Sequence, residues 1–257
     1  MKEQLYTIPL TDAFQARDEC PFCFVQRSLE QHSIDFVLGS GASYMEDDVR
    51  AETDKMGFCA RHYEKMFIYG NKLGNSLILE THIKKLSNDL KKELASFKPE
   101  AKPSLFSRFS KNNSADAASD NFVVRFVRTQ EHSCYICDHV ASTYARYLDT
   151  FFEMYKKDPS FRDLVKNGKG FCLPHFADLV QGAAGKLNEK DRSSLYEILF
   201  PQMTDALDRI AGDLDWFQKK FDYQFKDADW KDSKDAVQRA MQKAAGGYPA
   251  DPPYVQK

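Results

Sequence analysis

The stretch CPFC (Cys20–Cys23), followed by GFCARH (Gly57–His62), decides the fold of this chain because the same pattern occurs a second time. The second copy reads CYIC (Cys134–Cys137) and then GFCLPH (Gly170–His175). Together the two copies use all 6 cysteines of the 257 residues. Each copy contains a CxxC motif and a CxxH motif, and so offers three thiolates and one imidazole. This is the ligand set of a closed tetrahedral zinc site.

The two motifs of each copy are expected to meet within one helical unit. A CxxC motif at a tight turn directs both sulfurs to one centre, and a cysteine and a histidine three residues apart share one face of a helix. We therefore expect each copy to bind its own zinc ion, which gives two ions per chain. The predicted ligands are Cys20, Cys23, Cys59 and His62 for the first ion, and Cys134, Cys137, Cys172 and His175 for the second.

The chemistry of such a site indicates a structural role. Four protein ligands leave no open position for water or substrate, so the sequence does not predict a catalytic zinc ion. Zinc binding by small peptides contributes about 10–16 kcal/mol, which is comparable with the whole net stability of a domain. Three thiolates leave the site with a negative charge, and we expect Arg61 and Lys169 to be the nearby cations that stabilise it.

Three other uses of the same cysteines are possible. The CPFC motif is similar to the Cys-Pro-aromatic-Cys motif of glutaredoxins, but no strand pattern surrounds it and the second copy lacks the proline. An iron–sulfur cluster is usually held by four cysteines rather than by three and a histidine. Disulfides are disfavoured because the sequence starts without a signal-peptide pattern. Thiol redox chemistry and iron–sulfur binding stay open as alternatives to structural zinc.

The other titratable residues give weaker signals. His132 and His139 flank the second CxxC motif and could compete as ligands, but we expect these two, like His32 and His82, to be ordinary imidazoles without metal. The acidic run Glu46–Asp48 is typical of a solvated helix start rather than of acid–base catalysis. No glycine-rich phosphate loop, nucleophile elbow or calcium loop is visible. The sequence therefore predicts no catalytic residue.

Hydrophobic periodicity predicts an all-α fold. Residues 1–19 are expected to form an extended lead and then a short helical turn opened by Thr11 and Asp12. A long helix is predicted to end near 221 and to bend at Pro201. The other predicted helices cover residues 24–38, 44–55, 58 onwards, 79–97, 135–157, 160–167, 171 onwards and 231–244.

Two apolar stripes at helical spacing are expected to face the core. The first comprises Leu79, Ile83, Leu86, Leu90, Leu94 and Phe97, and the second comprises Met203, Leu207, Ile210, Leu214, Phe217 and Phe221. The ligand motifs and the stripes repeat in nearly one register, which indicates duplication of a helical unit. We predict two similar units, 1–98 and 121–247, packed pseudo-symmetrically and each pinned by a Cys3His zinc site. Residues 99–120 are expected to be a flexible linker and 248–257 a loose tail.

Composition limits the possible partners. Hydrophobic residues make up 42% of the chain and charged residues 29%, so a packed core is expected. A net charge of −2 gives no basic field for binding nucleic acid. No apolar run approaches the ~18 residues of a membrane span. We predict a cytoplasmic protein that binds neither nucleic acid nor membrane.

The motif residues resemble those of a family of uncharacterised bacterial proteins with duplicated CPxC and GFCxxH motifs, catalogued as a domain of unknown function. The likeness extends over most of the chain apart from the linker and tail. It implies a bacterial intracellular protein that binds zinc, and it supplies no activity or substrate. The positions that carry it are Cys20, Pro21, Cys23, Gly57, Phe58, Cys59, His62, Cys134, Cys137, Gly170, Phe171, Cys172, Pro174 and His175.

The function predicted from the sequence is that of a metal-stabilised binding or adaptor protein without catalysis, whose protein or small-molecule partner is not identified. The alternative is a thiol redox enzyme or a redox or metal sensor that uses the CxxC pairs. A third possibility is a small-molecule pocket between the two units. The 20 phenylalanines and 12 tyrosines could line such a pocket, but we expect them to fill the helical core.

Overall fold

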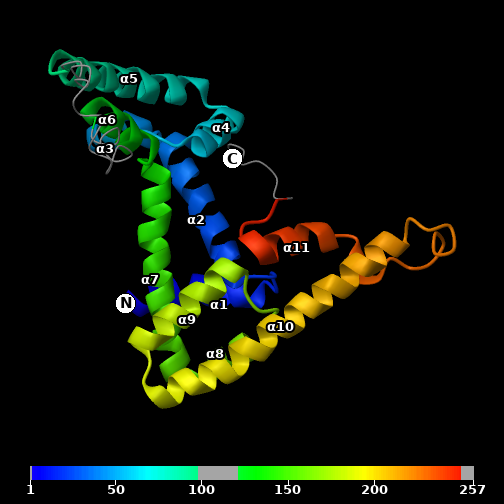
Figure 1. The fold of residues 1–257 in the computed structure, drawn as a ribbon. Coiled ribbons are helices and arrows are strands. Elements are labelled where there is room, and N and C mark those ends of the chain that lie inside the picture. The colour runs from blue at the N-terminus through cyan, green and yellow to red at the C-terminus, as the bar shows by residue number, and fades with distance from the viewer. Residues whose placement is uncertain (1, 98–120, 250–257) are drawn as a thin grey trace, which may run out of the picture. The chain divides into compact units, whose positions relative to one another are not determined.

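The computed structural model describes residues 2–97 and 121–249, and within these ranges it contains helices and no strand (Figure 1). The predicted linker 99–120 and residues 250–257 of the predicted tail lie outside the described residues. The helices of the first part are α1 (Lys2–Gln15), α2 (Pro21–Leu38), the short 3-10 helix η1 (Ser43–Met45), α3 (Asp47–Met56), α4 (Ala60–Tyr69) and α5 (Lys72–Ala95). Those of the second part are α6 (Phe122–Glu131), α7 (Tyr135–Lys157), α8 (Pro159–Lys166), α9 (Leu173–Lys186), α10 (Glu189–Lys219), η4 (Lys231–Ser233) and α11 (Ala236–Ala245).

The described residues divide into two compact units. Unit 1 combines the residues up to Glu30 with those from Val140 onwards, and unit 2 consists of the residues between, from Gln31 to His139. Both boundaries fall inside helices, so α2 and α7 each contribute to both units. Each unit therefore contains residues from both of the units predicted from the sequence.

The core of unit 1 is built from aromatic side chains. Phe14 contacts Phe22, Phe151 and Phe161 at ring-centroid distances of 5.0 to 6.3 Å, and all four rings are buried. Offset and edge-to-face pairs of this kind add about 0.5–1.5 kcal/mol each beyond the burial of their area. These phenylalanines fill the core, as expected from the sequence. Around it pack α1 with α8, and α10 with α8, α9 and α11.

The prediction of an extended lead for residues 1–19 is wrong, because α1 begins at Lys2 and continues through Pro9 to Gln15. Pro9 cannot donate a helical hydrogen bond, and an interior proline costs about 3 kcal/mol or more. The burial of Leu10 and Phe14 in the core of unit 1 offsets this cost. A buried Leu or Phe side chain contributes roughly 1.5–3 kcal/mol.

The first apolar stripe is also not the buried face of its helix. Ile83 is 54% exposed and Leu94 is 51% exposed, whereas Ile78 and His82 are buried. Since α3 packs against α5, Ile78 and His82 form its covered face. This face was not recognised from the apolar pattern of the sequence, because one of its residues is a histidine. For the second stripe, the prediction of burial is confirmed at Met203 and Ile210 of α10. It is wrong at Leu207 and Phe221, which are exposed.

No helix within residues 2–97 and 121–249 has the length and the apolar character needed to cross a membrane.

Candidate metal centres

The eight predicted ligands form two Cys3His clusters, but the partners differ from the prediction. We name the clusters by the order of their residues in the sequence, not by their burial. The outer cluster comprises Cys20, Cys23, Cys172 and His175, and the inner cluster comprises Cys59, His62, Cys134 and Cys137. In each cluster the four ligand atoms lie within 4.8 Å of one another. The prediction that each copy of the motif builds its own site is therefore wrong. Each CxxC motif meets the CxxH motif of the other copy, and in the sequence the inner cluster is nested inside the outer one.

The length of the helix that follows each CxxC motif explains why this motif pairs with the CxxH motif of the other copy. Helix α2 has 18 residues and α7 has 23, so they are about 27 and 34 Å long at 1.5 Å per residue. A chain that leaves Cys23 along α2 ends far from it, in unit 2, and α3 with 10 residues is followed by Cys59 in that same unit. Many of the residues between the CxxC and CxxH motifs of one copy thus form a long helix, and the chain does not fold back to bring these two motifs together.

Each CxxH motif lies at the start of a helix. Cys59 and Cys172 are the N-cap residues of α4 and α9, and their φ/ψ angles are nearly identical, at −74/162° and −74/161°. The histidine is the third residue inside the helix, where its ring turns back toward the N-cap sulfur. The preceding glycines, Gly57 with φ +59° and Gly170 with φ +83°, adopt a backbone conformation that other residues rarely reach.

Each CxxC motif also lies at a helix start. The carbonyl of Cys20 accepts a hydrogen bond from the N–H of Phe24 at 3.2 Å, and that of Cys134 accepts one from Asp138 at 3.0 Å. These cysteines therefore open α2 and α7. All four ligand segments present helix N-termini to the sulfurs, where the positive end of the helix dipole favours thiolates.

The distances between the ligand atoms match one tetrahedral ion. The sulfur–sulfur distances are 3.7 Å for Cys20–Cys172, 3.6 Å for Cys23–Cys172 and 3.8 Å for Cys59–Cys137. The distances from histidine Nδ1 to sulfur range from 3.1 to 3.6 Å. A tetrahedron with bonds of about 2.3 Å to sulfur and 2.0–2.1 Å to nitrogen has edges of about 3.8 and 3.6 Å. Both clusters are therefore able to enclose a metal ion.

The donors alter one another's affinity for protons. Burial raises the pKa of Cys137, and the adjacent sulfurs of Cys134 and Cys59 raise it further, to about 12. Burial acts in the same direction at Cys134, but contacts with the His62 ring and with backbone N–H groups outweigh it and lower the pKa to about 6. At His175 burial lowers the pKa, and three neighbouring sulfurs outweigh this effect and raise it to about 12. Sulfurs so close together can all be thiolates only when a cation shares their charge.

Contacts beside the ligands bring the two motifs of each cluster together. In the outer cluster Phe22 packs against Phe171 with ring centroids 5.9 Å apart, and both rings are buried. In the inner cluster the backbone N–H of Tyr135 donates a hydrogen bond to the carbonyl of Gly57 at 3.0 Å. The ring of Tyr135 also meets that of Phe58 at 6.3 Å.

A buried lysine that the sequence analysis missed ties the outer cluster together. Lys243 of α11 is 1% exposed, and its ammonium donates to the carbonyls of Glu19 at 2.5 Å and Lys169 at 2.7 Å. Glu19 directly precedes Cys20, and Lys169 precedes the GFC segment of the same cluster. Burial lowers the pKa of Lys243, and the nearby Glu19 carboxylate and Cys20 sulfur oppose this effect. Nothing in the local sequence marks this lysine, because its role depends on where α11 packs.

The carboxylate of Glu19 completes this support. Burial raises its pKa, but Arg209 and Lys243 outweigh burial, and the net pKa is lowered. Arg209 pairs with it at 2.6 Å, Lys243 at 3.2 Å and Arg239 at 3.6 Å. Three cations on α10 and α11 therefore fix the carboxylate that adjoins the first ligand of the outer cluster.

The remaining candidates lie outside the clusters. Lys169 contributes its backbone carbonyl rather than its ammonium group, and Arg61 is exposed. The acidic run is the exposed start of α3, as expected, with Glu46 as N-cap. His82 is a buried imidazole whose Nδ1 lies 2.9 Å from the carbonyl of Asp54. Neither cluster includes His32, His82, His132 or His139.

We expect Gly57→Ala to destabilise unit 2 by about 1–3 kcal/mol, because a non-glycine residue is strained in this backbone conformation. The new Cβ would also lie 2.7 Å from the ring of His82. Chemical denaturation followed by circular dichroism measures the effect. Gly185→Ala in α9 is the matched control, since no atom lies within 4 Å of its Cβ position. That variant should gain roughly 0.5–1 kcal/mol. Equal stability of the two variants would contradict the role assigned to Gly57.

Comparison with known families identifies the chain. The model of a family described as "Family of unknown function (DUF6062)" matches residues 1–251. The chain belongs to this family. The resemblance inferred from the duplicated motifs is thereby confirmed, since the family is one of unknown function and its model extends over both copies. Neither the curated proteins nor the solved structures gave a match.

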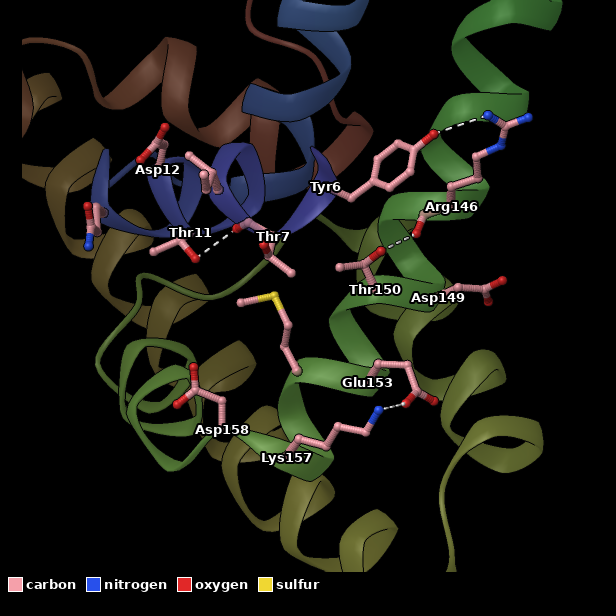
Figure 2. A pocket seen from close by; sticks show the side chains of 13 residues that line it. Tyr6, Thr7, Thr11, Asp12, Arg146, Asp149, Thr150, Glu153, Lys157 and Asp158 are labelled. Atoms are coloured by element: carbon pink, nitrogen blue, oxygen red, sulfur yellow. Dashed lines mark hydrogen bonds and ion pairs between the residues drawn. The ribbon is translucent and has the colours of Figure 1, made fainter. Parts of the chain in front are cut away.

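Unit 1 also contains an open groove between α1 and α7, with a volume of about 870 Å³ (Figure 2). Thr7 and Thr11 lie on its α1 side and Thr150 on its α7 side. Among the interactions that border the groove are a hydrogen bond of 3.1 Å from Arg146 to the Tyr6 hydroxyl and an ion pair between Lys157 and Glu153. Its lining is threonine-rich and charged rather than rich in phenylalanine.

Proposed function

We propose that the protein is a zinc-stabilised binding protein in which each cluster holds one structural zinc ion. The observation that carries this proposal is the agreement between three sulfur–sulfur distances, 3.6–3.8 Å, and the edge of a zinc–thiolate tetrahedron. The ligand set supports it, since three cysteines and a histidine are typical of closed structural sites. Each ion joins two helix starts that are far apart in the sequence, and so stabilises the packing of those helices within one unit.

The same distances argue against two of the three rival uses of the cysteines, disulfides and iron–sulfur clusters. A disulfide requires a sulfur–sulfur distance of about 2.05 Å, and none of the six cysteines forms one. An iron–sulfur cluster places several iron atoms between its ligands, each ligand binding its own iron, and so requires wider separations than the edge of a single-ion tetrahedron. A single iron ion in place of zinc would fit the same geometry, so metal analysis must distinguish the two.

The groove supports a binding role for unit 1. Its volume of about 870 Å³ is within the range of small-molecule and peptide sites. Its walls are α1 and α7, and α1 ends at Gln15, close in the sequence to Cys20, the first ligand of the outer cluster. In this proposal the zinc ions fix the helices, and the groove takes a protein or small-molecule partner without catalysis.

Metal analysis of protein purified without oxygen tests the zinc sites. We expect two zinc ions per chain by mass spectrometry of the metals, and no absorption in the visible range. Reconstitution with cobalt should give the intense visible bands of tetrahedral cobalt–thiolate coordination, with two cobalt ions bound. Brown protein that contains iron, or fewer than two ions per chain under these conditions, would contradict the proposal.

A further inference from the structure

The two clusters have the same ligands but differ in their access to solvent. In the outer cluster Cys20, Cys23 and Cys172 are each 0% exposed. In the inner cluster Cys134 is 2% exposed, but Cys59 and Cys137 are only partly buried. Cys59 and Cys137 are therefore the two cysteines of the clusters that keep partial exposure to solvent.

The packing explains why the outer cluster is closed. The turn after α11 covers it, since a Cβ at Gly246 would lie 3.6 Å from the sulfur of Cys172 and 3.9 Å from that of Cys23. The rings of Phe22 and Tyr144 lie against the imidazole of His175, with centroids 5.7 and 5.2 Å away. Backbone and aromatic rings thus shield this cluster.

The two partly exposed cysteines are also neighbours. The Sγ atoms of Cys59 and Cys137 are 3.8 Å apart, and they come from different motifs on α4 and α7. A disulfide bond requires about 2.05 Å, so the atoms must approach by less than 2 Å. The CxxC partner of Cys137 is the buried Cys134, which is less accessible to an attacking reagent.

We propose that the inner cluster is an oxidation site for hydroperoxides, at which Cys59 and Cys137 form a disulfide and the zinc ion leaves. This inference depends on the proposed zinc sites. One thiolate attacks a peroxide oxygen and becomes a sulfenic acid, and the O–O bond breaks. The second thiolate attacks that sulfur, forms the S–S bond and displaces hydroxide. With hydrogen peroxide, two protons from solvent complete two water molecules, and the two sulfurs supply two electrons.

Loss of zinc follows from the ligand count. After the disulfide forms, only Cys134 and His62 remain as donors to the ion, and two ligands do not hold zinc against competing chelators. The outer cluster keeps its four ligands and its ion. Oxidation therefore removes one of the two zinc ions of each chain and loosens unit 2 alone.

Stepwise oxidation of the two-zinc protein tests the proposal. Hydrogen peroxide is added to protein prepared without oxygen, zinc release is followed with a coloured chelator, and the cysteines are mapped by alkylation and peptide mass spectrometry. We expect release of one zinc ion per chain and a Cys59–Cys137 disulfide. The cysteines of the outer cluster should react at least about tenfold more slowly, because susceptibility follows thiolate exposure. Thiol reductant and added zinc should restore the original state.

Three results would overturn the inference: simultaneous release of both ions, a disulfide within Cys134–Cys137 instead of Cys59–Cys137, or full retention of zinc until the outer cysteines also react. The mapping uses the unaltered chain, so it does not depend on whether a cysteine variant folds. If the starting protein contains no zinc, the proposed function fails instead, and the metal analysis before oxidation separates the two cases.

Discussion

The double variant Cys20→Ser/Cys172→Ser is expected to keep one zinc ion bound in the presence of a competing chelator, whereas Cys20→Ser/Cys59→Ser is expected to keep none. The first pair removes two ligands from the outer cluster and leaves the inner cluster intact. The second pair removes one ligand from each cluster. Metal content after dialysis against the chelator measures the difference directly.

This comparison decides which motifs share an ion. If each copy of the motif bound its own ion, the outcome would be reversed, because Cys20 and Cys59 would then belong to one site. The two double variants each lose two thiols, so they are matched in chemistry and differ only in where the thiols are removed. Equal zinc content in both would contradict the crossed arrangement.

The expected loss of stability is large. Zinc binding of about 10–16 kcal/mol in peptides is as large as the free energy of unfolding of a typical domain, about 5–15 kcal/mol. Unit 1 joins a segment near the start of the chain to residues beyond 140. We expect Cys20→Ser/Cys172→Ser to lose cooperative unfolding of unit 1 while unit 2 stays folded. Hydrogen exchange with mass spectrometry resolves the two units within one sample.

Lys243→Ala is the second substitution with a large expected effect, a loss of about 3–5 kcal/mol. Removing one partner of a buried ion pair typically costs about 3–5 kcal/mol. We expect a loss toward the lower end of this range, because Arg209 and Arg239 still pair with Glu19. Two backbone carbonyls, of Glu19 and Lys169, also lose their donor. Chemical denaturation measures the loss, and we expect zinc to leave the outer cluster faster.

Two further variants make this result specific. Lys234→Ala removes an exposed lysine close to α11 and should change stability by less than about 0.5 kcal/mol. Lys243→Met keeps most of the side-chain volume but removes the ammonium group. If Lys243→Met were as stable as the parent protein, packing rather than hydrogen bonding would be the contribution of this residue.

The local structure of the ligand motifs could be predicted from the sequence. The CxxC and CxxH spacings place their donors at helix starts, and the helix predicted for 135–157 has the bounds of α7. These features depend on residues within one or two turns of each other. The eight donors do gather into two sets of three cysteines and one histidine.

The partnering of the motifs could not be predicted in the same way. It depends on the direction in which α2 and α7 leave their cysteines, and composition and periodicity do not fix this direction. The buried face of α5 was missed for a related reason. Ile78 and His82 are covered because α3 packs there, and a competing stripe with better periodicity included Ile83 and Leu94. The contribution of Lys243 likewise arises only from tertiary contacts.

The nested order of the two clusters determines when each one can form during protein synthesis. The inner set is complete once Cys137 has left the ribosome, while the first two cysteines of the outer set still wait for Cys172 and His175. At roughly 5–20 residues per second this interval lasts several seconds. During this interval Cys20 and Cys23 are on the nascent polypeptide without their two partner ligands. A shortage of cellular zinc would therefore first leave the outer cluster, which is completed last, without an ion.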